Sequence, residues 1–259
     1  MIVEILERIE EALRAAEAVL EGYTPGRIAA RAKAGGDPVT EADIEVNTRL
    51  HEILPRPGEG WLSEETRDDR DRLSCRNVWV VDPIDGTKEF VMGLPEWCVS
   101  IGWVEDGEAV AGGILNPAAG HLILGSFETG VTLNGREVAP RSTSSLEDAL
   151  VLASRSEVTR GEWRAYQERE FTVRPMGSVA YKLGLVAAGL ADATWTLVPK
   201  HEWDVAAGSA LVQAAGGSIF IPTDQDLHFN RHTPKLPGLV ALAAGTERLW
   251  AAESFELSA

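Results

Sequence analysis

The chain has 259 residues, enough for one large domain or two smaller lobes, and its 40 acidic against 24 basic residues give a formal net charge of −16. This charge argues against binding to nucleic-acid polymers or anionic membranes, because both require clustered basic residues, but it does not exclude a small anionic substrate. No apolar run reaches the roughly 20 residues of a membrane span, the Glu-rich N-terminus does not resemble a secretion signal, and the two cysteines predict no disulfide framework, so we expect a cytoplasmic protein.

The first predicted element is an amphipathic helix over residues 2–20, where apolar residues recur at intervals of three and four. A Gly-rich loop follows at 32–38. A second helix is expected from Thr40, because Thr40 and Asp43 have the spacing of a capping box. Pro and Gly residues after position 54 end that helix. A mainly antiparallel sheet is then predicted from four strand segments, at 78–81, 99–104, 110–115 and 121–126.

The second half of the chain alternates between strand and helix patterns. A strand is expected at 149–153 and another at 238–244, with helices at 178–191 and 203–215. Periodicity alone therefore predicts an α/β or α+β fold. The best candidate boundary between lobes is at 141–148. We expect an N-terminal α+β lobe at 1–145 that carries most of the acidic residues below, and a C-terminal α/β lobe at 146–259, in one compact unit.

Carboxylates stand at the ends of several predicted elements, and the sequence WVVDPIDGTKEF shows this most clearly. Its buried strand pattern ends in Asp82 and Asp85, and Mg²⁺ prefers such hard oxygen ligands. Each acidic residue taken alone has a simpler explanation. A turn or cap explains Asp82, a solvated run of charged residues explains Glu64 with Glu65, and helix capping explains Asp204 and fully explains Thr40 with Asp43. Their joint occurrence favours a metal site, built from the acidic clusters Asp37 with Asp43, Glu64 with Glu65, Asp82 with Asp85, and Asp204.

Four segments in this order resemble the signatures of the inositol monophosphatase superfamily: DPVTEAD at 37–43, SEE at 63–65, DPIDGT at 82–87 and EWDVAAG at 202–208. This family contains magnesium-dependent, lithium-sensitive phosphatases, and the resemblance spans residues 1–245. It implies the layered αβαβα sandwich of the sugar-phosphatase fold. It also implies two or three Mg²⁺ ions, Li⁺ as an inhibitor, a small anionic phosphorylated substrate, and a monomer or homodimer.

The resemblance also implies the metal ligands. Glu64, Asp82 and the carbonyl of Ile84 would hold the first Mg²⁺ ion. Asp82, Asp85 and Asp204 would hold the second, and a third, weaker ion would lie near Glu64. Magnesium would neutralise charge on the phosphoryl oxygens and on the leaving oxygen during an in-line displacement.

The catalytic roles follow from the same resemblance. Glu64 and Thr87, with Asp43 behind Thr87, would orient and activate the attacking water. The backbone N–H groups of Gly86 and Thr87 would receive the phosphate, at the start of a short helix. No covalent phosphoenzyme is implied. Ser63 stands where the family commonly has Gly, which leaves the ligand Glu64 unchanged.

Details next to the signatures bear on the substrate. Lys88-Glu89-Phe90 and Glu202 are similar to the 3'(2'),5'-bisphosphate nucleotidase (CysQ-type) branch, and Leu197 occupies the position where inositol phosphatases typically carry a Glu. A second phosphate needs cationic partners, for which the candidates are Lys33, Lys88, Arg155, Lys182 and Lys200. The complete set of expected substrate contacts is Gly86, Thr87, Lys88, Arg155, Ser178, Lys182 and Glu202.

The leading hypothesis is therefore a hydrolase that removes the 3'-phosphate of adenosine 3',5'-bisphosphate. The alternatives are an inositol monophosphatase, a broader phosphatase of fructose 1,6-bisphosphate or histidinol phosphate, and a binding module without activity. The intact set of acidic residues argues against the last. Trp203 is expected in the core, and packing explains Trp61, Trp97 and Trp195 better than base stacking does.

Overall fold

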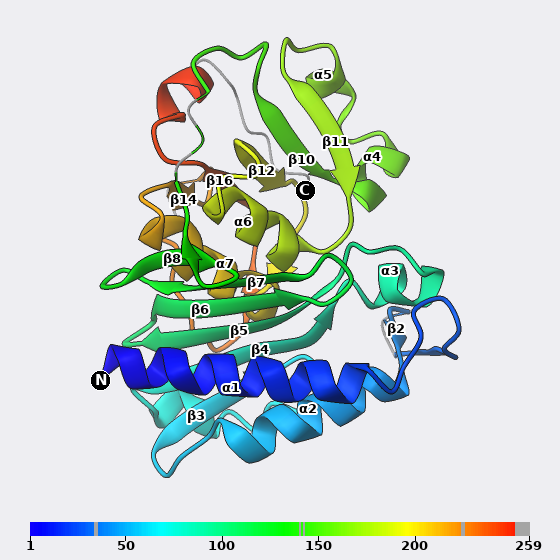
Figure 1. Cartoon of the computed structure of the whole chain (residues 1–259), viewed down its shortest axis with the longest axis vertical. Coiled ribbons are helices and arrows are strands. Elements are labelled where there is room, and N and C mark those ends of the chain that lie inside the picture. Colours follow the sequence, from blue (N-terminus) through cyan, green and yellow to red (C-terminus); the bar gives the residue numbers. More distant parts are fainter. Residues whose placement is uncertain (34–35, 140, 142, 224–225, 252–259) are drawn as a thin grey trace.

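The computed structural model describes residues 1–33, 36–139, 141, 143–223 and 226–251. Five layers are stacked in the order helices, sheet, helices, sheet, helices (Figure 1). This confirms the αβαβα sandwich expected from the family resemblance. Parts of the predicted loop at 32–38 and of the predicted boundary at 141–148 lie outside the described residues.

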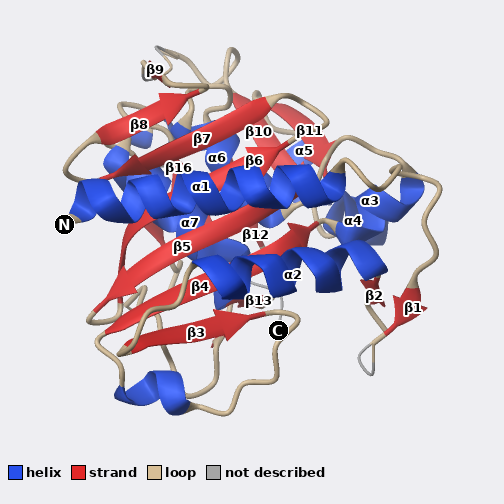
Figure 2. Ribbon diagram, turned by 60° about the horizontal axis from the view of Figure 1, so that its bottom comes forward, coloured by secondary structure: helices blue, strands red, loops and turns tan. Residues whose placement is uncertain are grey.

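The first layer consists of two helices, α1 (Ile2–Leu20) and α2 (Glu41–Ile53), which run side by side across one face of a sheet (Figure 2). Helix α1 buries the apolar stripe that includes Ile9 and Leu13, as its periodicity predicted. The capping box at the start of α2 is also confirmed. The Thr40 side chain accepts from the Asp43 N–H, and the Asp43 carboxylate accepts from the Thr40 N–H.

The second layer is a seven-stranded sheet whose strands follow chain order, and all neighbours are antiparallel except β3 and β4. The strands are β3 (Glu59–Ser63), β4 (Asn77–Asp85), β5 (Cys98–Glu105), β6 (Glu108–Asn116), β7 (His121–Ser126), β8 (Gly130–Leu133) and β9 (Arg136–Glu137). The short helix η1 (Asp71–Ser74) joins β3 to β4. Strand β3 was not predicted, because one of its buried positions is Gly60 and therefore gives no apolar signal.

The second sheet has the strand order β11-β10-β12-β16-β14. Its strands are β10 (Leu150–Ser154), β11 (Thr172–Met176), β12 (Ala193–Thr196), β14 (Ser218–Phe220) and β16 (Leu239–Leu242). Helices α6 (Val179–Ala187) and α7 (Glu202–Ala214) fill the layer between the sheets, and each contacts both. The outer elements are α4 (Arg155–Arg160), α5 (Arg164–Gln167) and η2 (Glu247–Trp250). The expected division at residues 145 and 146 stays a prediction.

Helix α7 approaches the first sheet closely because both surfaces carry small residues. A Cβ atom on Gly112 of β6 would lie 2.4 Å from the carbonyl oxygen of Ala207, so no larger residue fits there without moving the helix. This contact fixes the N-terminal end of α7, where Asp204 lies, near the carboxyl end of β4. None of the described helices is both long enough and apolar enough to span a bilayer.

Three small elements surround that end of β4. Helix α3 (Thr87–Met92) begins at the residue predicted to open a helix. Strands β1 (Arg31–Ala32) and β2 (Pro38–Val39) form a hairpin before α2, and β13 (Lys200–His201) pairs with β15 (Lys235–Leu236) before α7. These elements carry most of the basic residues discussed below.

Candidate active site

A bulge in β4 brings its two acidic residues to one face of the sheet. Residues three apart in a regular strand point to opposite faces. Here Asp82 pairs with Ser100 and Asp85 with Cys98, so β4 contains one extra residue between the two pairs. Ser100 and Cys98 share a face of β5, and their partners therefore share it too. Pro83 lies within the bulge, where its missing N–H costs no ladder bond.

Asp204 joins these two residues from the first turn of α7. Asp82, Asp85 and Asp204 each offer a ligand atom, and these atoms all lie within 4.8 Å of one another. Burial raises the pKa of all three carboxyl groups, and neighbouring negative charges raise the pKa of Asp82 and Asp204 further. The pKa of Asp204 rises to about 8.

Hydrogen-bond donors around the three carboxylates compensate only part of their negative charge. Asp85 accepts from the Ser178 hydroxyl at 2.7 Å and from the Ala180 N–H at 2.5 Å. Asp204 accepts from the His201 N–H, and Asp82 from the Ile84 N–H. Buried, converging hard oxygen atoms with uncompensated negative charge fit a divalent cation such as Mg²⁺.

Glu64, the fourth predicted carboxylate ligand, lines the same cavity but is bound to a lysine. The Lys33 ammonium lies 2.6 Å from Glu64 Oε1 and also contacts Glu65. Burial raises the pKa of Glu64, while Lys33 opposes the rise. Glu64 is therefore outside the group of three converging carboxylates, although its main-chain N–H bonds to the Val81 carbonyl beside them.

Thr87 and Asp43 form a buried hydrogen-bonded pair next to the cluster. The Thr87 hydroxyl lies 2.8 Å from Asp43 Oδ1 and 2.9 Å from the Ile84 carbonyl, and it can donate to either. The second oxygen of Asp43 accepts from the Thr40 N–H at 2.7 Å and from the Thr40 hydroxyl at 2.5 Å. The capping box of α2 thus holds Asp43 in place behind Thr87. Capping and the predicted catalytic position are therefore compatible.

Gly86 provides the turn between β4 and α3. Its φ of 96° lies in the left-handed region, and a Cβ atom would lie 2.8 Å from the Glu96 carbonyl oxygen. Only glycine fits both constraints. As a result, Thr87 begins a helix directly beside Asp85, with free N–H groups at its start.

These groups line one open cavity of about 370 Å³. Its walls contain the predicted residues Glu64, Asp82, Ile84, Asp85, Gly86, Thr87, Lys88 and Asp204, together with Asp37, Pro38, Val179, Pro199, Lys200, His201, Trp203 and Lys235. Trp203 was expected in the core, and it does pack against the hydrophobic core, but it also reaches the cavity wall. Trp203 is only half-buried and stacks on His201 with ring centroids 4.3 Å apart.

Four predicted substrate contacts are not among the residues lining this cavity, and each has another partner. Arg155 pairs with Glu96. Ser178 is buried and donates to Asp85, and Lys182 is 2% exposed and donates to the Ser178 carbonyl at 2.9 Å. Glu202 is fully buried and accepts from two backbone N–H groups. Their contact with substrate stays a prediction.

Lys235 was missed by the sequence reasoning. It lies in no signature segment, and it reaches the cavity only because β15 pairs with β13. One signal was present in the sequence. The chain contains only five lysines, and three of them, Lys33, Lys88 and Lys200, stand beside the signature segments.

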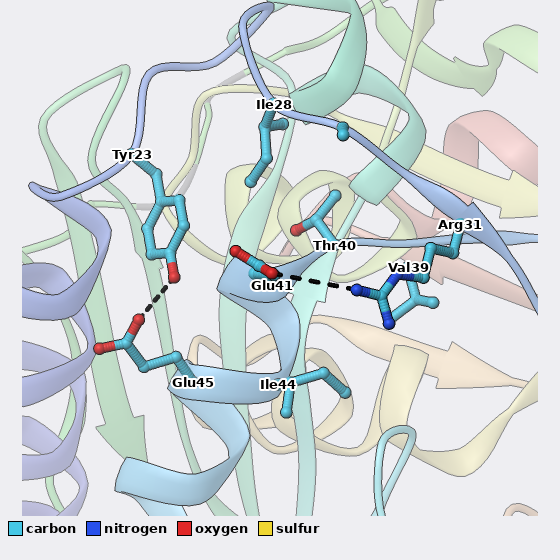
Figure 3. A pocket seen from close by; sticks show the side chains of 9 residues that line it. Tyr23, Ile28, Arg31, Val39, Thr40, Glu41, Ile44 and Glu45 are labelled. Carbon is cyan, nitrogen blue, oxygen red and sulfur yellow. Dashed lines mark hydrogen bonds and ion pairs between the residues drawn. The ribbon is translucent and has the colours of Figure 1, made fainter.

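A second cavity, of about 630 Å³, lies between the β1–β2 hairpin, the loop after α1 and the first turns of α2 (Figure 3). Tyr23 donates to Glu45 across it at 2.5 Å. Thr40 contributes to its wall as well as to the Asp43 network. None of its described lining residues belongs to the carboxylate cluster, so the chemistry concentrates in the smaller cavity.

Comparisons with known proteins agree with this geometry. Residues 2–256 match the model of the inositol monophosphatase family. An inositol-1-monophosphatase of Mesorhizobium japonicum is 34% identical over 196 residues, which cover 72% of this chain and 73% of the relative. A fructose-1,6-bisphosphatase/inositol-1-monophosphatase of Thermotoga maritima is 33% identical over 189 residues, 71% of either chain.

Two solved structures show the same fold. The extragenic suppressor protein SuhB of Bartonella henselae superposes with a TM-score of 0.78 and 26% identity, over 95% of this chain and 96% of that one. CysQ of Bacteroides thetaiotaomicron, described as a bacterial member of the inositol monophosphatase family, superposes with a TM-score of 0.76 and 25% identity, over 93% and 97%. The chain therefore belongs to the inositol monophosphatase family of magnesium-dependent phosphatases.

Proposed function

We propose that this protein hydrolyses the 3'-phosphate of adenosine 3',5'-bisphosphate with the help of Mg²⁺. The observation that carries the proposal is the composition of the 370 Å³ cavity, which combines a carboxylate cluster with lysine side chains. Carboxylates without a metal would repel a phosphate, and lysines would attract one. Both together suit a metal-dependent site for a highly anionic small molecule.

The metal ligands in this proposal are Glu64, Asp82, the Ile84 carbonyl, Asp85 and Asp204. Magnesium held there would neutralise the phosphoryl oxygens and favour ionisation of the attacking water. For Glu64 to act as a ligand, its carboxylate must exchange the Lys33 ammonium for the metal. Asp85 stays oriented throughout, because Ser178 and the Ala180 N–H bind one of its oxygens and leave the other available.

Thr87 positions the attacking water in this scheme. Its hydroxyl proton is committed to Asp43 or to the Ile84 carbonyl, so the oxygen presents a lone pair that can accept a hydrogen bond from water. Thr40 fixes Asp43 in turn. The free N–H groups at the start of α3 and the Lys88 side chain then receive the phosphate.

The choice of nucleotide over inositol rests on what surrounds the cluster. Leu197, at the position where inositol phosphatases typically carry a carboxylate for ring hydroxyls, is buried in the second sheet's core. It offers no polar group to a polyol. Lys88 and Lys200 instead add positive charge to the cavity wall. This favours a substrate with more than one phosphate.

A second candidate function is supported by the relatives. Their names include inositol-1-monophosphatase and fructose-1,6-bisphosphatase/inositol-1-monophosphatase. Hydrolysis of inositol phosphate, fructose 1,6-bisphosphate or histidinol phosphate would use the same metal chemistry and differ only in the wall of the cavity.

The deciding experiment measures released phosphate for adenosine 3',5'-bisphosphate, inositol 1-phosphate, fructose 1,6-bisphosphate and histidinol phosphate, with Mg²⁺ and with a chelator. We expect the nucleotide to have the highest kcat/KM and the chelator to abolish turnover. Much faster turnover of inositol 1-phosphate would overturn the nucleotide assignment. Unchanged activity in Asp85→Asn would overturn the metal assignment, because this variant keeps the size of the side chain and removes its charge.

Three further properties belong to the proposal. Li⁺ is expected to inhibit by replacing the second Mg²⁺, and titration of activity with LiCl against KCl at equal ionic strength measures this. A cytoplasmic location and a monomeric or homodimeric state stay predictions.

A further inference from the structure

The lysines of this chain are concentrated at one place. The sequence has five lysines among its 24 basic residues, so the rest are arginines. Lys88, Lys200 and Lys235 line the cavity of the carboxylate cluster. Lys33 binds Glu64 in its wall, and Lys182 lies behind Ser178, which contacts Asp85. A chain that used lysine only for solubility would scatter it over the surface.

The five lysines differ in whether they are free to bind a ligand. Lys33 is paired with two glutamates, and Lys182 is buried and bonded to a carbonyl. For Lys88, Lys200 and Lys235 no ion pair is formed with a carboxylate among the described residues. Three ammonium groups in one cavity that lack such partners are poised for an anion from outside the protein.

Lys235 is held in place by a buried network although its own side chain is exposed. The Glu202 carboxylate accepts from the backbone N–H of Asn230 at 2.8 Å and of Arg231 at 2.9 Å, and the Glu202 N–H donates to the Pro234 carbonyl at 3.1 Å. The buried Arg72 donates to the Asn230 side chain and to the Arg231 carbonyl. The segment that carries Lys235 is thus tied to both α7 and η1.

Both lysines of the β13–β15 pair line the cavity of the carboxylate cluster, one from each strand. Lys200 pairs across the ladder with Leu236, and Lys235 pairs with His201. The His201 N–H donates to Asp204, so the ladder adjoins the cluster. The two ammonium groups therefore belong to one wall of the cavity, next to the carboxylates.

We propose that Lys200 and Lys235, presented by the β13–β15 ladder, bind a second phosphate of the substrate while its first phosphate lies at the carboxylate cluster. This inference rests on the proposed phosphatase function and deepens it, because it assigns specificity to a residue outside every signature segment. A substrate that carries one phosphate would leave the Lys235 subsite empty. Nucleotide and sugar bisphosphates share the required chemistry, and the experiment separates them.

The test uses two matched pairs of substrates, each differing only in the second phosphate. The nucleotide pair is adenosine 3',5'-bisphosphate with adenosine 3'-monophosphate, and the sugar pair is fructose 1,6-bisphosphate with fructose 1-phosphate. The readout is the ratio of kcat/KM within each pair, at fixed Mg²⁺ and fixed ionic strength. We expect a ratio of about 10- to 100-fold in favour of the bisphosphate in one pair, the range of one charge-assisted contact. The pair that shows it identifies the source of the phosphate.

Three variants distinguish binding of the second phosphate by Lys235 from a general effect of the protein's positive charge. In Lys235→Gln the ratio should fall about tenfold, mainly because KM for the bisphosphate rises, and Lys235→Arg should retain most of the ratio. Arg136→Gln removes one positive charge at an exposed position in β9 and should leave the ratio unchanged. Since the ratio compares two substrates in one preparation, partial unfolding of a variant does not affect it.

The results that would overturn the inference are specific. A ratio near one in both pairs for the unchanged protein, or a ratio that survives in Lys235→Gln, removes the second-phosphate subsite and leaves the phosphatase function standing. If no substrate of either pair releases phosphate with Mg²⁺, the proposed function fails and the inference fails with it.

Discussion

The carboxylate cluster predicts an unusual dependence of stability on pH and Mg²⁺. In the metal-free protein, Asp82, Asp85 and Asp204 have raised pKa values because the surrounding protein removes much of their hydration. A carboxyl group whose pKa is higher in the folded than in the unfolded state favours folding when it is protonated. Its contribution is full below the unfolded pKa and is lost as the pH rises through the folded pKa.

The size of the expected change in the free energy of unfolding can be worked out for Asp204, since its pKa rises from 3.8 to about 8. Between about pH 5.5 and pH 8, such a shift removes roughly 3 kcal/mol of the free energy of unfolding, at about 1.36 kcal/mol per pKa unit. Asp204 is only half-buried, and solvent screening lowers the figure to about 1–3 kcal/mol. For a chain of this size the expected fall in Tm is about 3–10 °C.

The assay is thermal unfolding at pH 5.5 and pH 8, with a chelator and with Mg²⁺. Mg²⁺ should raise Tm more at pH 8, where it binds carboxylates that are otherwise ionised and unpaired. Asp204→Asn should reduce both the pH dependence and the response to Mg²⁺, while Asp69→Asn, at an exposed site, should preserve both. A chelated protein that is at least as stable at pH 8 as at pH 5.5, with the same slope in Asp204→Asn, would refute this reasoning.

Three shorter predictions follow from single contacts. Thr87→Val should lower kcat about 100-fold or more with a small change in KM, because the hydroxyl oxygen that orients the attacking water is lost. The phosphate-release assay measures this, and Thr48→Val, on the exposed side of α2, is the control variant. Gly112→Val should lower the free energy of unfolding in urea by about 1–3 kcal/mol, since its side chain would collide with Ala207. Glu202→Ala should cost about 1–3 kcal/mol in the same measurement, because two buried N–H groups lose their acceptor, whereas Glu128→Ala, at an exposed site, should have little effect.

Much of the fold could be predicted because the periodicity of each long element matches its burial. The stripe containing Ile9 predicted α1, and the Thr40 capping box predicted the start of α2. The layer order came only from the family resemblance, since periodicity does not determine which sheet a strand joins. Strand β3 was missed because Gly60 occupies an inward position.

The site could be predicted in part for a similar reason. The spacing of Asp82 and Asp85 indicated acidic residues at the end of a strand, but a regular strand would point them to opposite faces. The bulge that unites them depends on the pairing with β5, which local sequence does not specify. Lys235 was missed because only the long-range pairing of β15 with β13 brings it to the cavity.

The use of lysine in place of arginine at this cavity has a physical reason that leads to a last prediction. Arginine binds carboxylates through two parallel N–H groups, as Arg8 does with Glu59. An arginine beside Asp85 and Asp204 would occupy the oxygens that a metal needs. Lys200→Arg keeps the charge, yet it should raise the Mg²⁺ concentration for half-maximal activity about fivefold, equivalent to about 1 kcal/mol.

Lys235→Arg should leave this Mg²⁺ concentration unchanged, because Lys200, and not Lys235, is among the charges that lower the pKa of Asp85 and Asp204. A titration of activity with Mg²⁺ compares the two variants directly. Equal shifts in both would mean that the two lysines act on the metals only through their charge. If only Lys200→Arg raises the Mg²⁺ concentration for half-maximal activity, position 200 requires a cation that does not bind two carboxylate oxygens at once. The need to leave these oxygens for the metal would then explain why the residue there is lysine and not arginine.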